Sequence, residues 1–143
     1  MKTFQLPIRF EAILYTKVEN SIKYLIIKRV PDDGGFWQPI TGTHESNESL
    51  QDCMIREIGE EVGYDSGLIK EFTDKIYEFT WMKKEKLIYE YVFGVELKEQ
   101  KDPTLSPAEH DDFKWVSYDE AMSTLKMEDN KKALTILNEM LAK

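Results

Sequence analysis

Residues 42–64 read GTHESNESLQDCMIREIGEEVGY, and this stretch decides both the fold and the chemistry expected of the chain. On a helix with about 100° per residue, Glu57, Glu60 and Glu61 occupy positions i, i+3 and i+4 and share one face. Three apolar side chains share another face, which can pack against a sheet: Ile55, Ile58 and Val62. Carboxylates on one helical turn repel each other, and a hard divalent cation with oxygen ligands, such as Mg²⁺, relieves that repulsion.

The ends of this helix carry their own signals. We predict that it runs from about Glu48 to Val62, with Asn47 as its N-cap and Gly63 in the left-handed conformation after its last turn. Arg56 stands four residues before Glu60, so its planar guanidinium can hold a carboxylate in one rotamer.

Outside the helix, the chain alternates short strands and turns. Aromatic and β-branched residues predict strands over residues 8–18, 24–27, 36–41, 69–81, 86–97 and 113–116. The third of these is expected to end at Gly42. Ser117, with Glu120 three residues later, forms a capping box, and a C-terminal helix carries apolar residues along one face: Ala133, Leu134, Ile136, Leu137, Met140 and Leu141. The order β, β, β, α, β, β, β, α predicts a mixed α/β fold.

Composition limits the classes of function. The 143 residues include 19 basic and 27 acidic side chains, a net charge of -8, which disfavours binding to a nucleic-acid duplex. The single Cys53 cannot form an intramolecular disulfide, and we find neither a signal peptide nor a membrane span. We therefore expect one domain over residues 1–143, in the cytoplasm and away from membranes.

The stretch from Gly42 to Tyr64 resembles the Nudix box, G-x5-E-x7-R-E-U-x-E-E-x-G-U, where U is aliphatic. The fixed letters of the box fall on Gly42, Glu48, Arg56, Glu57, Glu60, Glu61 and Gly63. The last position departs from the pattern, because Tyr64 is aromatic. The resemblance implies an α/β/α sandwich with a mixed sheet, hydrolysis of a pyrophosphate bond, and Mg²⁺ as the cofactor, with Mn²⁺ as a substitute.

The resemblance also implies roles for particular residues. Glu57, Glu60 and Glu61 would be metal ligands, with Glu61 the least replaceable, and Arg56 would act beside them. The loop before the helix brings the backbone carbonyls of Thr41 and Gly42 to the same end, so Gly42 joins the expected metal site. Downstream, residues 109–115 read EHDDFKW and resemble a segment in related Nudix enzymes in which the glutamate reaches the metal. Glu109 is therefore expected to be an extra ligand or a general base.

The expected substrate contacts lie on the strands. Arg29 ends the second strand, where the family often places a phosphate-binding residue, and Arg9 on the first strand can face the same cleft. Thr41 is a further candidate contact. Trp37, or alternatively Tyr89, is expected to stack on a base or pterin ring. For Trp37, packing in the core is an equal alternative.

Residues 36–42, FWQPITG, are similar to the corresponding segment of dihydroneopterin triphosphate pyrophosphohydrolases. We therefore expect a Mg²⁺-dependent pyrophosphohydrolase that cleaves a (d)NTP or dihydroneopterin triphosphate to a monophosphate and pyrophosphate. Asymmetric cleavage of diadenosine tetraphosphate is the alternative substrate reaction. A non-catalytic nucleotide-binding module is the alternative of another class, and it is disfavoured because all carboxylates of the box are present. The expected partner is a small nucleotide or pterin triphosphate, and the expected assembly is a monomer or a homodimer.

Overall fold

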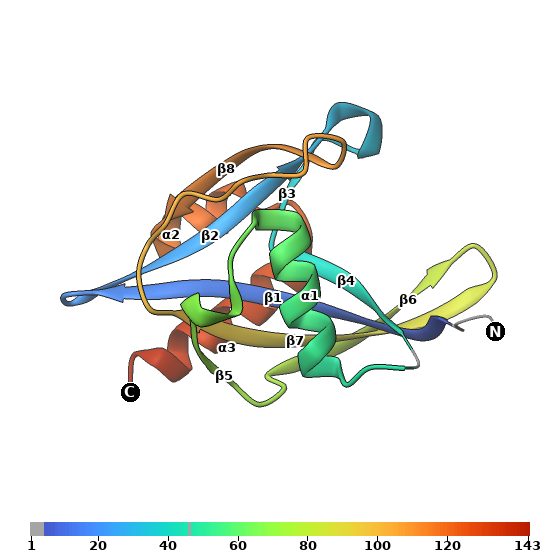
Figure 1. Cartoon of the computed structure of the whole chain (residues 1–143), viewed down its shortest axis with the longest axis horizontal. Helices are drawn as coiled ribbons and strands as arrows, with labels where there is room; N and C mark the ends of the chain where they lie inside the picture. The colour runs from blue at the N-terminus through green and yellow to red at the C-terminus, as the bar shows by residue number, and fades with distance from the viewer. Residues whose placement is uncertain (1–4, 46) are drawn as a thin grey trace.

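The computed structural model describes residues 5–45 and 47–143, over which the chain forms an eight-stranded sheet and three α-helices (Figure 1). The strands are β1 Gln5–Val18, β2 Ser21–Arg29, β3 Trp37–Gln38, β4 Ile40–Glu45, β5 Ile69–Phe72, β6 Tyr77–Lys83, β7 Lys86–Leu97 and β8 His110–Val116. The helices are α1 Leu50–Val62, α2 Tyr118–Thr124 and α3 Glu128–Leu141. Residues 1–4, on which the expected lack of a signal peptide partly depends, lie outside the described chain.

The central strand β1 changes partner along its length, and this change shapes the site. Residues 15–18 of β1 pair antiparallel with β2, whereas residues 9–12 pair antiparallel with β4. On its other side, β1 pairs in parallel with β7, from Ile8 opposite Tyr89 to Tyr15 opposite Glu96. The remaining ladders are antiparallel, so the predicted mixed sheet is confirmed. Because β2 and β4 pair with different parts of β1, the two strands diverge and leave room between them.

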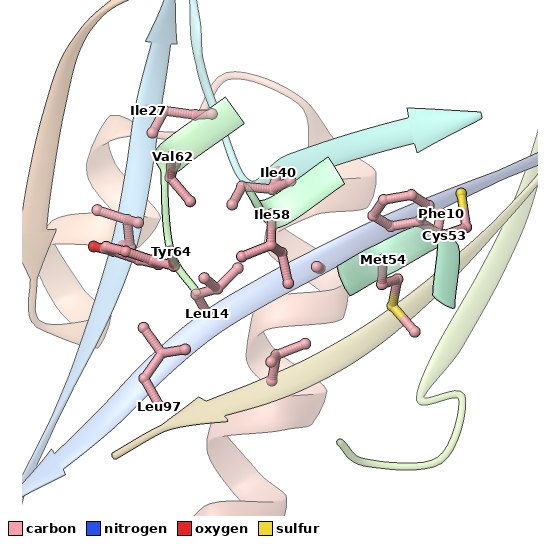
Figure 2. Packing of buried hydrophobic residues seen from close by; sticks show 13 residues of the cluster. Phe10, Leu14, Ile27, Ile40, Cys53, Met54, Ile58, Val62, Tyr64 and Leu97 are labelled. Atoms are coloured by element: carbon pink, nitrogen blue, oxygen red, sulfur yellow. The ribbon is translucent and has the colours of Figure 1, made fainter. Parts of the chain in front are cut away.

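Helices cover both faces of the sheet, as expected for an α/β/α sandwich. Alternate residues of β1 enter two separate hydrophobic clusters, because successive side chains of a strand point to opposite faces. Phe10 and Leu14 pack with Ile58 and Val62 of α1, as Figure 2 shows. The opposite face of β1 packs against the second cluster, which includes residues of α2 and α3: Ile13, Tyr15, Ala121, Ala133, Leu134 and Leu137.

The ends of α1 confirm one prediction and correct another. Gly63 has φ 72° and ψ 17°, the predicted left-handed conformation. The N-cap, however, is Ser49 and not Asn47, because the Ser49 hydroxyl accepts a hydrogen bond of 3.0 Å from the Asp52 backbone N–H. The helix therefore begins at Leu50, two residues later than expected.

Several strand predictions also change. β1 and β2 each begin three residues earlier than expected, at Gln5 and Ser21. The strand expected to end at Gly42 is two strands, β3 and β4, and β4 continues to Glu45 because Gly42 pairs with Phe10 in the middle of a ladder. The strand expected over residues 69–81 is likewise divided into β5 and β6. Both pair with β7, but the Thr73 hydroxyl accepts a hydrogen bond of 2.8 Å from the Gly94 N–H, and the ladder is interrupted there. The last strand starts earlier than expected, at His110.

The C-terminal region contains two helices where one was expected. Ser117 caps α2 as predicted, since its hydroxyl accepts a hydrogen bond of 3.2 Å from the Glu120 N–H. Residues 125–127 then separate α2 from α3, which packs on the sheet through its apolar face. No helix within residues 5–45 or 47–143 is both long and apolar enough to cross a membrane.

Candidate active site

A cavity of about 720 Å³ opens where β2 and β4 diverge. Its walls come from parts of the chain that are distant in sequence: β1, the end of β2, β3, β4, α1, β6, β7, the turn before β8, and the start of α3. Among the residues expected to form the site, seven line this cavity: Arg9, Arg29, Thr41, Gly42, Glu57, Glu61 and Glu109.

Glu57 and Glu61 project from α1 into the cavity, one helical turn apart. Glu61 is only 6% exposed, and its Oε2 accepts no hydrogen bond from the described part of the chain. Burial raises the pKa of Glu61 to about 8, with further contributions from the nearby carboxylates of Glu57 and Glu109. Burial also raises the pKa of Glu57, against the opposing effect of Arg56. The cavity therefore concentrates negative charge that has too few positive partners.

The turn before β8 brings Glu109 to the same place. Its backbone carbonyl accepts a hydrogen bond of 3.0 Å from the Val30 N–H, which fixes this turn beside the end of β2. One potential ligand atom from each of Glu61, Glu109 and His110 lies within 4.8 Å of the others. The expectation that Glu109 approaches the glutamates of the helix thus agrees with the geometry.

Gly42 allows β4 to pass directly beneath α1. A Cβ atom at this position would lie 2.5 Å from Phe10 Cε2 and 2.7 Å from Glu57 Cγ. Because real Cβ atoms do not approach other atoms so closely, a larger residue would displace either the core ring or the glutamate side chain.

We predict that Gly42→Ala lowers the free energy of unfolding by about 1–3 kcal/mol, the usual cost of overpacking, and lowers activity through the displaced Glu57. Thermal denaturation and kcat measure the two effects. Gly59→Ala is the matched control, since a Cβ there meets nothing closer than 3.8 Å and alanine favours a helix. If Gly42→Ala kept the melting temperature and activity of the wild type, the close approach of β4 to α1 would not require glycine at this position.

Arg56 pairs with carboxylates both inside and outside the cavity lining. Its guanidinium donates to both oxygens of Glu48, at 2.7 and 3.2 Å, and also contacts Glu57 at 3.0 Å. This arrangement explains why the box contains Glu48. The bidentate hydrogen bonds to Arg56 lower the pKa of Glu48 and hold the guanidinium in a fixed orientation.

Glu60 lies outside the cavity. Its carboxylate is 3.3 Å from Arg56 Nη1, the i, i+4 contact expected from the sequence, and its side chain is 60% exposed. Its expected role as a metal ligand stays a prediction, because the Glu60 side chain would have to turn toward Glu57 and Glu61.

Two arginines supply positive charge to the cavity. Arg9 donates to the hydroxyls of Thr43 at 3.0 Å and Thr41 at 3.2 Å, so Thr41 holds the guanidinium of Arg9 in the cavity wall. Arg29 donates to the Gln38 side-chain oxygen at 3.0 Å and also pairs with Asp33. Both arginines lie close enough to Glu61 to oppose the rise in its pKa.

Trp37 is not part of the cavity wall, which corrects the expected stacking contact. Its half-buried ring packs against the second hydrophobic cluster, and Lys114 Nζ lies 5.1 Å from the ring centroid. The alternative, Tyr89, is also absent from the lining and is exposed. The phenyl and indole side chains that do line the cavity are Phe36, before β3, and Phe79 and Trp81 of β6.

Sequence reasoning missed the polar residues on the α3 side of the cavity: Glu11, Glu90 and Asn130. It also left His110 out of the site, although this buried imidazole approaches Gln38 with a separation of 3.3 Å between their Nε2 atoms. Burial lowers the pKa of His110, which favours the neutral ring. Glu11 could have been noticed, because it is a carboxylate within the otherwise apolar run of residues 10–15.

The chain falls in a class of hydrolases that act on phosphoanhydride bonds. More particularly, the chain belongs to the Nudix family, since the profile of the NUDIX domain matches residues 9–137.

Three characterised relatives are similar in sequence. A dihydroneopterin triphosphate diphosphatase from Haemophilus influenzae is 32% identical over 133 residues, covering 85% of this chain and 81% of that protein. An asymmetrical bis(5'-nucleosyl)-tetraphosphatase from Sus scrofa is 28% identical over 128 residues, covering 87% and 85%. An octanoyltransferase from Myxococcus xanthus is 33% identical over 124 residues, but the match spans 83% of this chain and only 33% of that protein.

Solved structures agree on the fold. A crystal structure of an Ap4A hydrolase from C. elegans superimposes with a TM-score of 0.81, covering 94% of this chain and 97% of that one. The sequence identity is 20%, so this likeness concerns the fold alone. It confirms the predicted α/β/α arrangement.

Proposed function

We propose that this protein is a Mg²⁺-dependent pyrophosphohydrolase that cleaves a (d)NTP or dihydroneopterin triphosphate to a monophosphate and pyrophosphate. The observation that carries the proposal is the buried, unpaired Oε2 of Glu61, which faces a cavity that also contains Glu57, Glu109 and two arginines. The diphosphatase from Haemophilus influenzae supports the choice of a triphosphate with a nucleoside-like group.

The side chains at this end of the cavity suit Mg²⁺. Mg²⁺ prefers oxygen ligands, and Glu57, Glu61 and Glu109 supply carboxylates that repel one another without a cation. Glu60 and the backbone carbonyl of Gly42 complete the expected ligand set. When bound, Mg²⁺ would neutralise the phosphate charge and act as a Lewis acid, and Mn²⁺ could replace it.

The side chains of the cavity would accept a proton from water and bind the phosphates. The raised pKa of Glu61 makes its carboxylate a suitable acceptor for the proton of an attacking water, with Glu109 as the second candidate base. Arg9 and Arg29 offer hydrogen-bond donors to phosphate oxygens. Arg56 does not line the cavity but contacts two residues that do, Glu57 at 3.0 Å and Glu45 at 3.9 Å, so we assign it a positioning role.

Asymmetric cleavage of diadenosine tetraphosphate is the second candidate reaction, and the porcine relative supports it. A non-catalytic nucleotide-binding module is the third candidate. It would not need a buried glutamate whose pKa lies close to the working pH, so the Glu61 environment favours an enzyme.

The test is phosphate and pyrophosphate release with Mg²⁺ from a panel: each (d)NTP, dihydroneopterin triphosphate, diadenosine tetraphosphate, ADP-ribose and NADH. We expect one triphosphate to be hydrolysed far faster than the rest, with pyrophosphate as a product. Fastest release from diadenosine tetraphosphate would favour the second candidate. No release from any compound by a folded protein that binds Mg²⁺ would contradict the proposed reaction.

We predict that Mg²⁺ stabilises the protein, and more so at pH 8 than at pH 5. Glu61 keeps its proton up to about pH 8 when folded but loses it near pH 4.5 when unfolded. The unfolded state therefore binds fewer protons between these values, and the stability of the metal-free protein falls as the pH rises. Mg²⁺ competes with that proton, so it binds best at high pH.

At ten times its dissociation constant, Mg²⁺ should add about 1.4 kcal/mol, or about 4 °C in melting temperature. Differential scanning fluorimetry measures this shift, with NaCl at matched ionic strength as the control. A transition that ignores millimolar Mg²⁺ at pH 8 would count against the carboxylates as a metal site.

Two further expectations stay proposals: a cytoplasmic location and a monomer or homodimer in solution. Light scattering after size exclusion tests the second.

A further inference from the structure

The α3 side of the cavity contains polar side chains that are almost completely buried. Glu11 is 2% exposed, Asn130 4% and Glu90 5%, and all three line the cavity. Asn130 Nδ2 donates a hydrogen bond of 2.6 Å to Glu11 Oε1, which joins α3 to the central strand. Glu90 accepts a hydrogen bond of 2.9 Å from Trp81 Nε1 and lies 3.6 Å from Arg9 Nε.

Two acceptor atoms in this group have no donor within the described residues: Glu11 Oε2 and Asn130 Oδ1. Buried polar atoms are normally hydrogen-bonded, and an unpaired one is costly. Burial and a side-chain contact with the Glu90 carboxyl raise the pKa of Glu11, which favours its protonated form. N–H donors of a bound ligand would replace that proton and favour the ionised carboxylate as their acceptor. What this end of the cavity lacks is therefore a pair of N–H or O–H groups.

Aromatic rings lie beside these acceptors. Phe79 and Trp81 stand on the same face of β6 and line the cavity, and the hydrogen bond to Glu90 fixes the indole of Trp81. Aromatic walls next to a few fixed polar groups suit a planar heterocycle, which stacks on the rings and pairs through its edge.

The two acceptors distinguish between heterocycles. Guanine and pterin share a 2-amino-4-oxopyrimidine ring, in which a ring N–H stands next to an exocyclic amino group, so both positions donate. Adenine instead places an unprotonated ring nitrogen beside its amino group, and that lone pair would face an acceptor. We propose that Glu11 and Asn130 form the subsite that selects a 2-amino-4-oxopyrimidine ring.

This subsite deepens the proposed function and rests on it for the phosphate end of the substrate. Glu11 follows Arg9 by two residues on β1, so both side chains leave the same face of the strand, and both line the same cavity. A substrate whose ring meets Glu11 can therefore reach Arg9 and Glu61 with its phosphates. The inference favours GTP-like and pterin substrates and disfavours diadenosine tetraphosphate, whose bases are adenines.

The test compares kcat/KM for GTP, ITP, ATP and dihydroneopterin triphosphate with Mg²⁺. ITP is the informative analogue, because it differs from GTP only in lacking the 2-amino group. We expect a preference of at least about 10-fold for GTP over both ITP and ATP, the range of a paired base edge. The ratio of GTP to dihydroneopterin triphosphate tells whether the natural ring is guanine or pterin.

Glu11→Gln tests the residue itself. Asn130 Nδ2 should donate its hydrogen bond to the oxygen of the new amide, as it does to Glu11 Oε1. The amide nitrogen then takes the place of Oε2. This N–H donor would oppose the N–H donors of the ligand. We expect the GTP to ATP ratio to fall at least about 10-fold. Glu139→Gln, an exposed change on the same helix as Asn130, is the matched control and should leave the ratio unchanged.

The outcomes separate this inference from the proposed function. Equal use of GTP, ITP and ATP by the wild type would overturn the inference while leaving the hydrolase intact, and ordered water would then be the missing donor. An unchanged ratio in a folded Glu11→Gln would overturn it as well. If no triphosphate is hydrolysed, calorimetric binding of the α,β-methylene analogues of GTP and ATP to the wild type still tests the subsite.

Discussion

We expect Glu61→Gln to lower kcat about 1,000-fold with Mg²⁺ and the best substrate, within the range usual for loss of a general base. The amide cannot accept a proton from water, and it binds a hard cation less well than a carboxylate does. The effect should be larger than for any other single substitution, because Glu61 lies deepest among the carboxylates at this end of the cavity, at 6% exposure.

The thermal stability of Glu61→Gln shows whether a loss of activity comes from the missing carboxylate or from unfolding. The raised pKa of Glu61 means that its ionised form destabilises the folded protein at pH 8. Glutamine removes that charge, so metal-free Glu61→Gln should melt at or above the wild-type temperature at pH 8. Well below pH 4.5, the wild-type carboxyl is protonated in both states, and the two proteins should converge.

Glu139→Gln again provides the control, as an exposed change of the same chemistry that should keep wild-type kcat. Wild-type turnover in Glu61→Gln would remove this residue from the reaction. The base would then be sought at Glu109, which stands in the same group of potential ligand atoms.

The sequence predicted the helix of the site well because local interactions determine that helix. The i, i+4 spacing places Glu57 and Glu61 one turn apart on the same face, and Gly63 ends the helix through its own backbone conformation. The choice between Asn47 and Ser49 as the cap was harder, because both side chains can accept the hydrogen bond. Only the path of the chain from β4 decides between them.

The far end of the cavity was beyond prediction because it joins residues that are distant in sequence. Glu11 and Asn130 are 119 positions apart and meet only when α3 packs on the sheet. Along β6, half-buried Tyr77, Phe79 and Trp81 alternate with exposed residues. That Phe79 and Trp81 reach the cavity, whereas Trp37 does not, depends on how β6 packs beside distant parts of the chain.

The second large effect is expected at Arg56, which does not line the cavity but contacts Glu57 of the proposed reaction centre. It holds Glu48 through two hydrogen bonds, Glu57 at 3.0 Å and Glu60 at 3.3 Å. Arg56→Ala leaves these carboxylates without a common partner, so Glu57 loses the contact that fixes its orientation. We expect kcat to fall about 100-fold, a cost usual for small misplacements of a catalytic group.

The same substitution should lower the free energy of unfolding by about 2 kcal/mol, since hydrogen bonds to charged groups are among the stronger ones. Arg56→Lys is the matched variant, because it keeps the charge but cannot bind Glu48 through two nitrogens while reaching Glu57. If only the positive charge of Arg56 matters, Arg56→Lys should keep wild-type activity. If the planar guanidinium sets the position of Glu57, Arg56→Lys should recover more of the stability than of kcat.

A positioning role also predicts how the loss divides between kinetic constants. Arg56 does not line the cavity, so KM for the triphosphate should change little while kcat falls. The concentration of Mg²⁺ needed for half-maximal rate should rise, because an unconstrained Glu57 binds the cation less well. A large rise in KM with unchanged kcat would instead mean that Arg56 binds substrate phosphate, and its carboxylate contacts would then have to break during turnover.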